Sequence, residues 1–212
     1  MTRMKKIKPD KKTKAVLFDL GKVILDFDFT PAFDRLSKHC ALDPEEIKSY
    51  FSASGLEVLY DGGKISSVEF YREVKKGLNY RLGFTRFKKI WNEIFTLNPE
   101  VAQIIQNAKE DYRLVLVSNT NAMHFDYIRV KYPLLRHFDR FILSYKEKAR
   151  KPDPKIYKKA IRACRANPEE ILYIDDREDL TEAAGTLGLH TFTFKKNAGE
   201  LLKKMAGLGI RC

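Results

Sequence analysis

The sequence predicts an α/β protein in which helices flank a parallel sheet and a small all-helical region is inserted after the first strand. Two observations indicate the sheet: an apolar run at residues 16–18, and apolar runs that alternate with helical patterns over residues 99–206. Such alternation is typical of right-handed βαβ units. A third observation indicates the insert, because the pattern from residue 30 to residue 97 is helical and shows no strand.

The first strand and the insert follow from local signals. The apolar run 16–18 ends on Asp19, and Gly21 marks a sharp turn directly after it. Thr30 and Pro31 are typical of a helix start and begin the first of four helices that we expect in the insert.

The second half of the chain supplies the rest of the sheet. Four further strands are expected there, at residues 114–118, 141–144, 171–174 and 190–194. Asp153 and Pro154 begin the clearest of the helices between them. The predicted division of the chain is a basic flexible tail (1–14), a core (15–29 and 98–206) and a four-helix insert (30–97).

Polar residues stand at the ends of several predicted strands. They are Asp19, Ser118 with Asn119, Ser144 with the basic run 146–151, and Asp175 with Asp176. In a parallel sheet these ends meet at one edge, where ligands bind.

This set of residues suits a divalent cation beside an anionic group such as phosphate. Carboxylates are the oxygen ligands that Mg²⁺ prefers, and a hydroxyl with free backbone N–H groups binds phosphate oxygens. A lysine neutralises the charge on a transferring group, and a carboxylate can attack phosphorus as a nucleophile. We favour Lys151 over Lys148 for the lysine, because Lys151 lies directly before the helix that starts at Pro154.

Four segments resemble, in order, the four motifs of the haloacid dehalogenase-like hydrolase superfamily. They are FDLGKV (18–23), VLVSNTN (115–121), RKPDPKIY (150–157) and YIDDREDLTEAAGTLG (173–188). The resemblance implies a Rossmann-like core, and it identifies the insert with the small helical C1 cap of this superfamily. The first two motifs are similar to those of bacterial sugar-phosphate phosphatases of the glucose-1-phosphate type, whose first motif also reads Asp-Leu-Gly.

The resemblance also implies roles for individual residues. Asp19 would be the nucleophile that forms an aspartyl-phosphate. Ser118 would bind the phosphate, helped by the backbone N–H groups of Leu20 and Asn119. Lys151 would stabilise Asp19 and the phosphate charge.

The implied cofactor is Mg²⁺. Asp19, the backbone carbonyl of Gly21 and Asp176 would hold it, with Asp175 as a further direct or water-mediated ligand. The activity implied is that of a Mg²⁺-dependent phosphatase whose substrate is a small phosphorylated metabolite.

The first motif departs from the usual pattern at Gly21, where most relatives carry a second aspartate that acts as general acid. Such acid catalysis typically contributes about 10²–10⁴-fold. We therefore expect a substrate with a good leaving group, such as an anomeric sugar phosphate. The alternatives are that Asp26 or Asp28 substitutes for the missing acid, or that the protein is slow or inactive. In the fourth motif, Leu180 stands where many relatives carry Asp or Asn, which puts support of the metal site in question.

Two other functions stay open at this point. A haloacid-type dehalogenase needs no leaving-group acid, but the paired carboxylates Asp175 and Asp176 favour a metal site. A non-catalytic protein that binds phosphate or a partner would also be consistent with the loss of the acid.

Composition and charge limit the partners and the cellular compartment that we expect for this protein. The net charge is +12, and the first 14 residues hold seven lysine and arginine residues, with the remainder spread along helix-like segments. This distribution argues against a nucleic-acid surface, which would gather such charge on one face. No apolar run is long enough to span a membrane, and three widely spaced cysteines show no disulfide pattern, so we expect a cytoplasmic protein.

Overall fold

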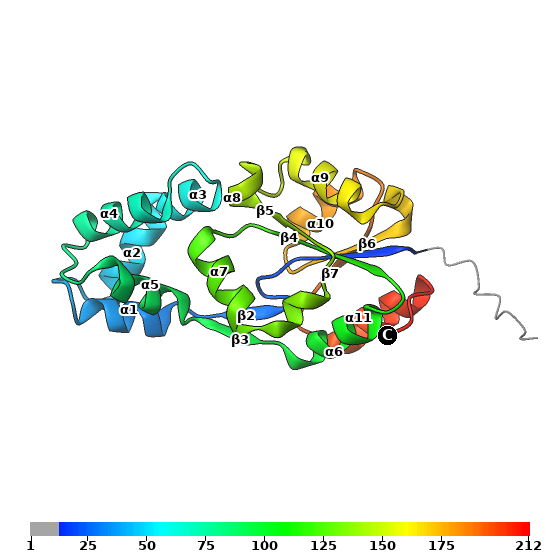
Figure 1. The fold of residues 1–212 in the computed structure, drawn as a ribbon, viewed down its shortest axis with the longest axis horizontal. Helices are drawn as coiled ribbons and strands as arrows, with labels where there is room; N and C mark the ends of the chain where they lie inside the picture. The colour runs from blue at the N-terminus through cyan, green and yellow to red at the C-terminus, as the bar shows by residue number, and fades with distance from the viewer. Residues whose placement is uncertain (1–12) are drawn as a thin grey trace, which may run out of the picture.

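A parallel sheet forms the centre of the computed structural model, which describes residues 13–212 (Figure 1). Within these residues the sheet has five strands in the order β5-β4-β1-β6-β7, all parallel. The strands are β1 (Ala15–Phe18), β4 (Arg113–Ser118), β5 (Arg140–Leu143), β6 (Ile171–Asp175) and β7 (His190–Thr193). The predicted fold class is confirmed.

The central strand β1 is buried on both sides, which explains its unbroken apolar sequence. Val16 and Phe18 face one layer of helices, and Ala15 and Leu17 face the other. The first layer consists of α6 (Pro99–Ala108), α7 (Ala122–Lys131), the 3-10 helix η1 (Pro133–His137) and α11 (Ala198–Gly207). The second layer consists of α9 (Pro154–Cys164) and α10 (Glu178–Gly185).

The remaining large group of helices lies to one side of the sheet and is called the cap here (Figure 1). Between residues 30 and 92 it contains α1 (Thr30–Ser37), α2 (Pro44–Ser54), α3 (Leu56–Asp61), α4 (Ser67–Gly77) and α5 (Phe84–Asn92). The predicted number of four helices is therefore wrong. Gly55 adopts a left-handed conformation with φ of 65°, so it ends α2 and allows a separate short helix to follow.

The core of the cap is aromatic. The ring of Trp91 lies 4.8 Å from that of Phe51 and 5.3 Å from that of Phe70, and it stacks on Phe87 at 5.7 Å. Trp91 and Phe87 therefore lie at the centre of the aromatic packing in the cap. The cap thus has a hydrophobic core of its own, separate from the two that flank the sheet.

A short antiparallel ribbon of β2 (Leu25–Phe27) and β3 (Phe95–Leu97) joins the cap to the sheet domain. The prediction that residues 30–97 contain no strand is therefore wrong at Phe95–Leu97. Three residues are too few to show the alternation of a strand, and Phe95 continues the apolar spacing of α5. β2 lies just before the predicted start of the insert at residue 30, and β3 ends at its predicted end, residue 97. The segment that enters the cap and the segment that leaves it are therefore paired with each other.

The structure describes only the last two residues of the predicted basic tail (1–14), Thr13 and Lys14. Residues 1–12 lie outside the described part. Thr13 is buried, and the backbone N–H of Lys14 donates to Glu170 O at 2.8 Å. These two residues therefore belong to the edge of the sheet domain. Across residues 13–212, none of the helices has the length and apolar character that crossing a membrane requires.

Candidate active site

The carboxyl ends of the central strands bring four of the predicted site residues together. Asp19 directly follows β1, Ser118 ends β4 and Asp175 ends β6. Lys151 lies in the segment between α8 (Ser144–Glu147) and α9. All four residues are buried, with relative exposures of 6% or less. The fold thus concentrates ionisable groups where an open α/β sheet binds ligands.

Lys151 joins two carboxylates at the centre of this site. Its Nζ donates to Asp19 Oδ1 at 2.7 Å and to Asp175 Oδ2 at 2.6 Å. The hydroxyl of Tyr173 also donates to Asp175 Oδ2. Lys148, the alternative considered from the sequence, is exposed. The structure therefore places Lys151, and not Lys148, against the predicted nucleophile.

The backbone of Lys151 is fixed by the side chain of Asn119. Asn119 Oδ1 accepts from Lys151 N at 2.8 Å, and its Nδ2 donates to Lys151 O at 3.0 Å. The sequence pointed only to the backbone N–H of Asn119. No spacing pattern in the sequence indicates that its side chain binds a residue 32 positions away. Tyr173 lies inside an apolar strand, and nothing in the sequence indicates its hydrogen bond to Asp175.

Burial and charge shift the ionisation of this cluster. Burial raises the pKa of Asp19 to about 7, and the neighbouring Asp175 adds to the rise while Lys151 opposes it. Burial alone would lower the pKa of Lys151, but the carboxylates of Asp19 and Asp175 outweigh it, and the pKa is raised. Lys151 is therefore a cation at neutral pH. A divalent cation beside Asp19 would further favour the ionised carboxylate.

The same edge offers a group of ligands for a hard cation. Asp19, Asp175 and Asp176 each present one oxygen, and these atoms lie within 4.8 Å of one another. Asp175 is partly engaged, because its Oδ1 accepts from Arg177 N at 3.0 Å while Lys151 and Tyr173 hold Oδ2. Asp176 is only partly buried. Three carboxylates without nitrogen or sulfur ligands fit Mg²⁺.

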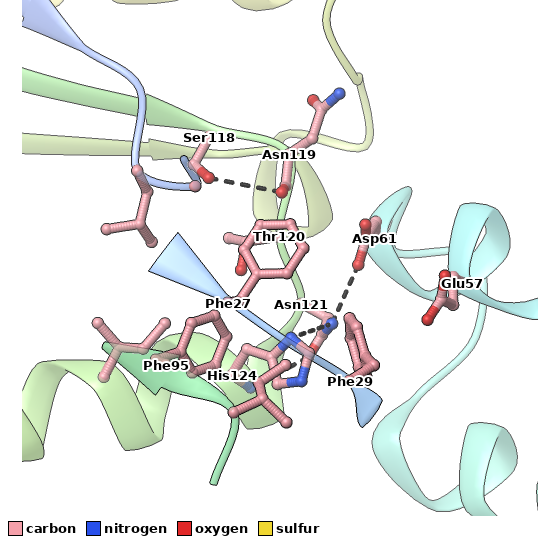
Figure 2. Close-up of a pocket in the computed structure, with 14 residues that line it drawn as sticks. Phe27, Phe29, Glu57, Asp61, Phe95, Ser118, Asn119, Thr120, Asn121 and His124 are labelled. Atoms are coloured by element: carbon pink, nitrogen blue, oxygen red, sulfur yellow. Dashed lines mark hydrogen bonds between the residues drawn. The ribbon is translucent and has the colours of Figure 1, made fainter. Parts of the chain in front are cut away.

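A cavity of about 180 Å³ lies between this edge of the sheet and the cap. Leu20, Gly21, Ser118 and Asn119 line its end on the sheet side. Figure 2 shows Glu57 and Asp61 entering from helix α3 on the opposite side. Aromatic and aliphatic side chains form much of the remaining wall: Phe27, Phe29, Ile94, Phe95 and Ile128.

Asp61 attaches the cap to the sheet domain. Its Oδ1 accepts from Asn121 Nδ2 at 3.0 Å (Figure 2), and its backbone carbonyl accepts from Ser144 Oγ at 2.5 Å. Gly63 follows in a left-handed conformation, and a Cβ there would lie 2.1 Å from the carbonyl oxygen of Tyr145. The segment 61–63 is therefore a place where the cap packs on the sheet domain.

A family model described as haloacid dehalogenase-like hydrolase matches residues 13–208 of the chain. The chain belongs to the haloacid dehalogenase-like hydrolases. This confirms the family that the four motifs resemble.

Two relatives of this hydrolase are named as phosphatases. The chain is 26% identical to a D-ribitol-5-phosphate phosphatase from Bacteroides thetaiotaomicron, over 84% of this chain and 90% of the relative. It is 23% identical to a phosphorylated carbohydrates phosphatase from Thermotoga maritima, over 83% of this chain and 82% of the relative. A solved structure of a haloacid dehalogenase family enzyme from B. thetaiotaomicron, in complex with magnesium and inorganic phosphate, is 25% identical with a TM-score of 0.80 and covers 89% of this chain and 98% of that one.

Gly21, the glycine in the first motif of this hydrolase, lies against the ring of Phe27. A Cβ at Gly21 would lie 3.1 Å from Cε1 of Phe27, closer than ordinary side-chain contact. An aspartate at this position would therefore require the Phe27 ring to shift. The Phe27 ring that lines the cavity thus packs against the position where most relatives carry the acid.

The two aspartates proposed as substitutes do not face the cavity of the hydrolase. Asp26 pairs with Lys22 and, at 2.9 Å, with Lys196, and these hydrogen bonds hold its pKa well below the usual range. Asp28 accepts from Thr30 N at 2.9 Å, which also lowers its pKa. Neither lines the cavity beside Gly21, so the structure does not support a substitute acid at Asp26 or Asp28.

The fourth motif has two further features. Leu180 is buried, and its backbone carbonyl accepts from Tyr157 OH at 3.0 Å, so it packs in the core. Asp179 forms an exposed ion pair with Arg177. Arg177 N and Lys151 Nζ, which both donate to Asp175, are instead the groups that orient the carboxylates here.

His124 is packed between the cap and the sheet domain. Its Nε2 lies 3.1 Å from Trp91 O and must donate to it, so Nδ1 accepts from Asn121 Nδ2 at 3.2 Å. Burial lowers the pKa of His124 to about 4. The imidazole is therefore neutral at pH 7 and helps to orient Asn121, the partner of Asp61.

Proposed function

We propose that this hydrolase is a Mg²⁺-dependent phosphatase that acts on a small phosphorylated carbohydrate through an aspartyl-phosphate at Asp19. The observation that carries the proposal is the buried Lys151, which bridges Asp19 and Asp175 beside Ser118. The names of its relatives, which act on ribitol 5-phosphate and on phosphorylated carbohydrates, support the substrate class.

In the first step the Asp19 carboxylate attacks phosphorus, and the bond between phosphorus and the leaving-group oxygen breaks. Ser118 and the backbone N–H groups of Leu20 and Asn119 bind the non-bridging oxygens. Lys151 offsets the charge on the transferring group from a position that requires no reorganisation. In the second step water attacks phosphorus, inorganic phosphate leaves and the Asp19 carboxylate is restored.

Asp19, the Gly21 carbonyl, Asp176 and Asp175 would hold the Mg²⁺ ion. When bound, it would neutralise phosphate charge and draw the substrate towards Asp19. Asp175 has a second function, because its contact with Lys151 fixes the ammonium group between the two carboxylates.

The preferred substrate is a phosphate ester with a good leaving group. Neither Gly21 nor the ion-paired Asp26 supplies a proton to the departing oxygen. A leaving group of low pKa, such as the anomeric oxygen of a sugar 1-phosphate, needs little protonation in the transition state. We also propose that the enzyme acts in the cytoplasm and on small molecules rather than on nucleic acids.

A screen of phosphorylated carbohydrates with Mg²⁺, run beside Asp19→Asn, tests the proposal. We expect phosphate release by the wild type, none by the variant, and higher kcat/KM for anomeric phosphates than for primary-alcohol phosphates. Equal kcat/KM for the two classes would contradict the leaving-group argument. Release of halide from a 2-haloacid in the presence of a chelator, without phosphate release, would show a dehalogenase instead.

A further inference from the structure

Glu57 is the carboxyl group of the cap that faces the active-site cavity without a partner. It lies four residues before Asp61 on α3, so both side chains are on the same face of the helix. The carboxylate of Asp61 accepts a hydrogen bond from Asn121 Nδ2. Glu57 forms no hydrogen bond or ion pair with any residue in the range 13–212. Glu57 is partly buried and lines the cavity.

Two polar side chains that line the cavity with Glu57 are already engaged. Asn121 Nδ2 donates to Asp61 and lies within hydrogen-bond distance of His124 Nδ1. His124 Nε2 is bonded to the Trp91 carbonyl. Phe29 also lines this cavity beside Glu57 (Figure 2), and Glu57 borders a second hollow that Asp28, Thr30, Lys48 and Ser52 line as well. A ligand that fills the cavity therefore meets a single available carboxyl group at the cap end.

We propose that Glu57 binds a hydroxyl group on the carbon chain of the substrate, and that it thereby selects polyhydroxylated phosphate esters over plain alkyl esters. The inference rests on the proposed phosphatase function, because it assumes that the phosphate occupies the end of the cavity at Ser118 and Asn119. Glu57 and these two residues lie on opposite sides of the cavity in Figure 2.

The chemistry around Glu57 favours a hydroxyl over an ammonium group. Burial, and then the charge of Asp61, raise the pKa of Glu57 to about 7, so the carboxyl group both accepts and donates hydrogen bonds near neutral pH. The positive charge of Arg150 acts on Glu57 in the opposite direction and would repel a cationic substrate. The apolar wall would pack against the C–H groups of the carbon chain.

Competitive inhibition measures this selection whether or not a given ester is a good substrate. With p-nitrophenyl phosphate as the reporter, Ki is determined for a linear pentitol 5-phosphate and for n-pentyl phosphate, which has the same chain length and no hydroxyl group. The proteins are the wild type, Glu57→Ala, Glu57→Gln and the matched control Glu45→Ala, an exposed cap position whose partner is Lys48.

We expect the wild type to bind the pentitol ester more tightly than the pentyl ester. Glu57→Ala should weaken pentitol binding by about 10- to 100-fold, the usual value of a hydrogen bond to a charged group, and leave pentyl binding within about twofold. Glu57→Gln should restore part of the preference, and Glu45→Ala should match the wild type.

Two results would overturn the inference. They are equal Ki values for the two esters in the wild type, and an unchanged ratio of the two Ki values in Glu57→Ala. If the wild type does not hydrolyse the reporter at all, the proposed function fails. Calorimetric titration of the same two esters then decides the role of Glu57 separately.

Discussion

The two ends of the active-site cavity are built differently. At the sheet end, Asp19, Lys151 and Asp175 are buried and joined by hydrogen bonds of 2.6–2.7 Å. At the cap end, the wall is mainly aromatic, and Glu57 has no partner among residues 13–212. The sheet end is thus organised before any ligand binds, which suits a fixed chemical step. The cap end leaves its polar group available, which suits recognition of a variable part of the substrate.

The largest effect is expected from Asp19 at the sheet end. Asp19→Asn removes the nucleophile but keeps the size of the side chain, so kcat should fall by roughly 10³-fold or more. Asp26→Asn, an ion-paired position outside the cavity, serves as the control and should remain within a few fold of the wild type. Steady-state phosphate release measures both. Comparable activity in the two variants would contradict the assignment of the chemical step to the sheet end of the cavity.

Metal removal should have the next largest effect. Chelation should abolish phosphate release, and added Mg²⁺ should restore it. Mg²⁺ should also raise the thermal unfolding temperature of the wild type, because an ion that binds only the folded state stabilises it. Asp176→Asn should lose most of this rise, whereas Asp179→Asn, in its exposed pair with Arg177, should keep it. Activity that survives full chelation would contradict the metal site.

Lys151 should affect both activity and stability. Lys151→Ala leaves Asp19 and Asp175 buried without their shared cation, and breaking a buried pair in this way costs about 3–5 kcal/mol. Activity should fall by about 10²–10³-fold, as for the loss of one preorganised charge-stabilising donor. Urea unfolding and steady-state kinetics measure the two effects. Lys148→Ala, on the exposed side of the same segment, should change neither, and an equal loss there would remove the distinction between them.

The sheet end could be predicted from the sequence because its residues lie beside apolar runs. Asp19, Ser118 and Asp175 each close a buried strand, and parallel strands bring such positions to one edge. The preference for Lys151 over Lys148 rested on a helix start and agrees with their positions in the structure.

The cap end could not be predicted in the same way. The bond between Asp61 and Asn121 joins residues 60 positions apart, and no periodicity encodes it. The Phe27 ring beside Gly21 depends on the β2–β3 ribbon, whose three-residue strands are too short to show a pattern. The orientation of Glu57 into the cavity depends on where α3 begins, and Gly55 fixes that through its backbone conformation.

The smallest expected effect concerns His124, where cap and core meet. Burial lowers its pKa from 6.5 to about 4, so between these values the unfolded chain binds a proton that the folded chain does not. The free energy of unfolding should therefore fall as pH falls from 6.5 to 4, with about 3 kcal/mol from this residue. His124→Gln should flatten this part of the pH profile of the free energy of unfolding. An unchanged profile in His124→Gln would contradict the neutral, buried imidazole.

The central claim is that Asp19 forms a phosphoryl adduct, and trapping with beryllium fluoride tests it most directly. This reagent mimics a phosphoryl group on a carboxylate and can be followed by ¹⁹F NMR. We predict bound fluorine resonances for the wild type with Mg²⁺, their loss on chelation and their absence in Asp19→Asn. A wild type that gives no bound resonance with Mg²⁺, or an Asp19→Asn variant that gives the same resonance, would contradict the account.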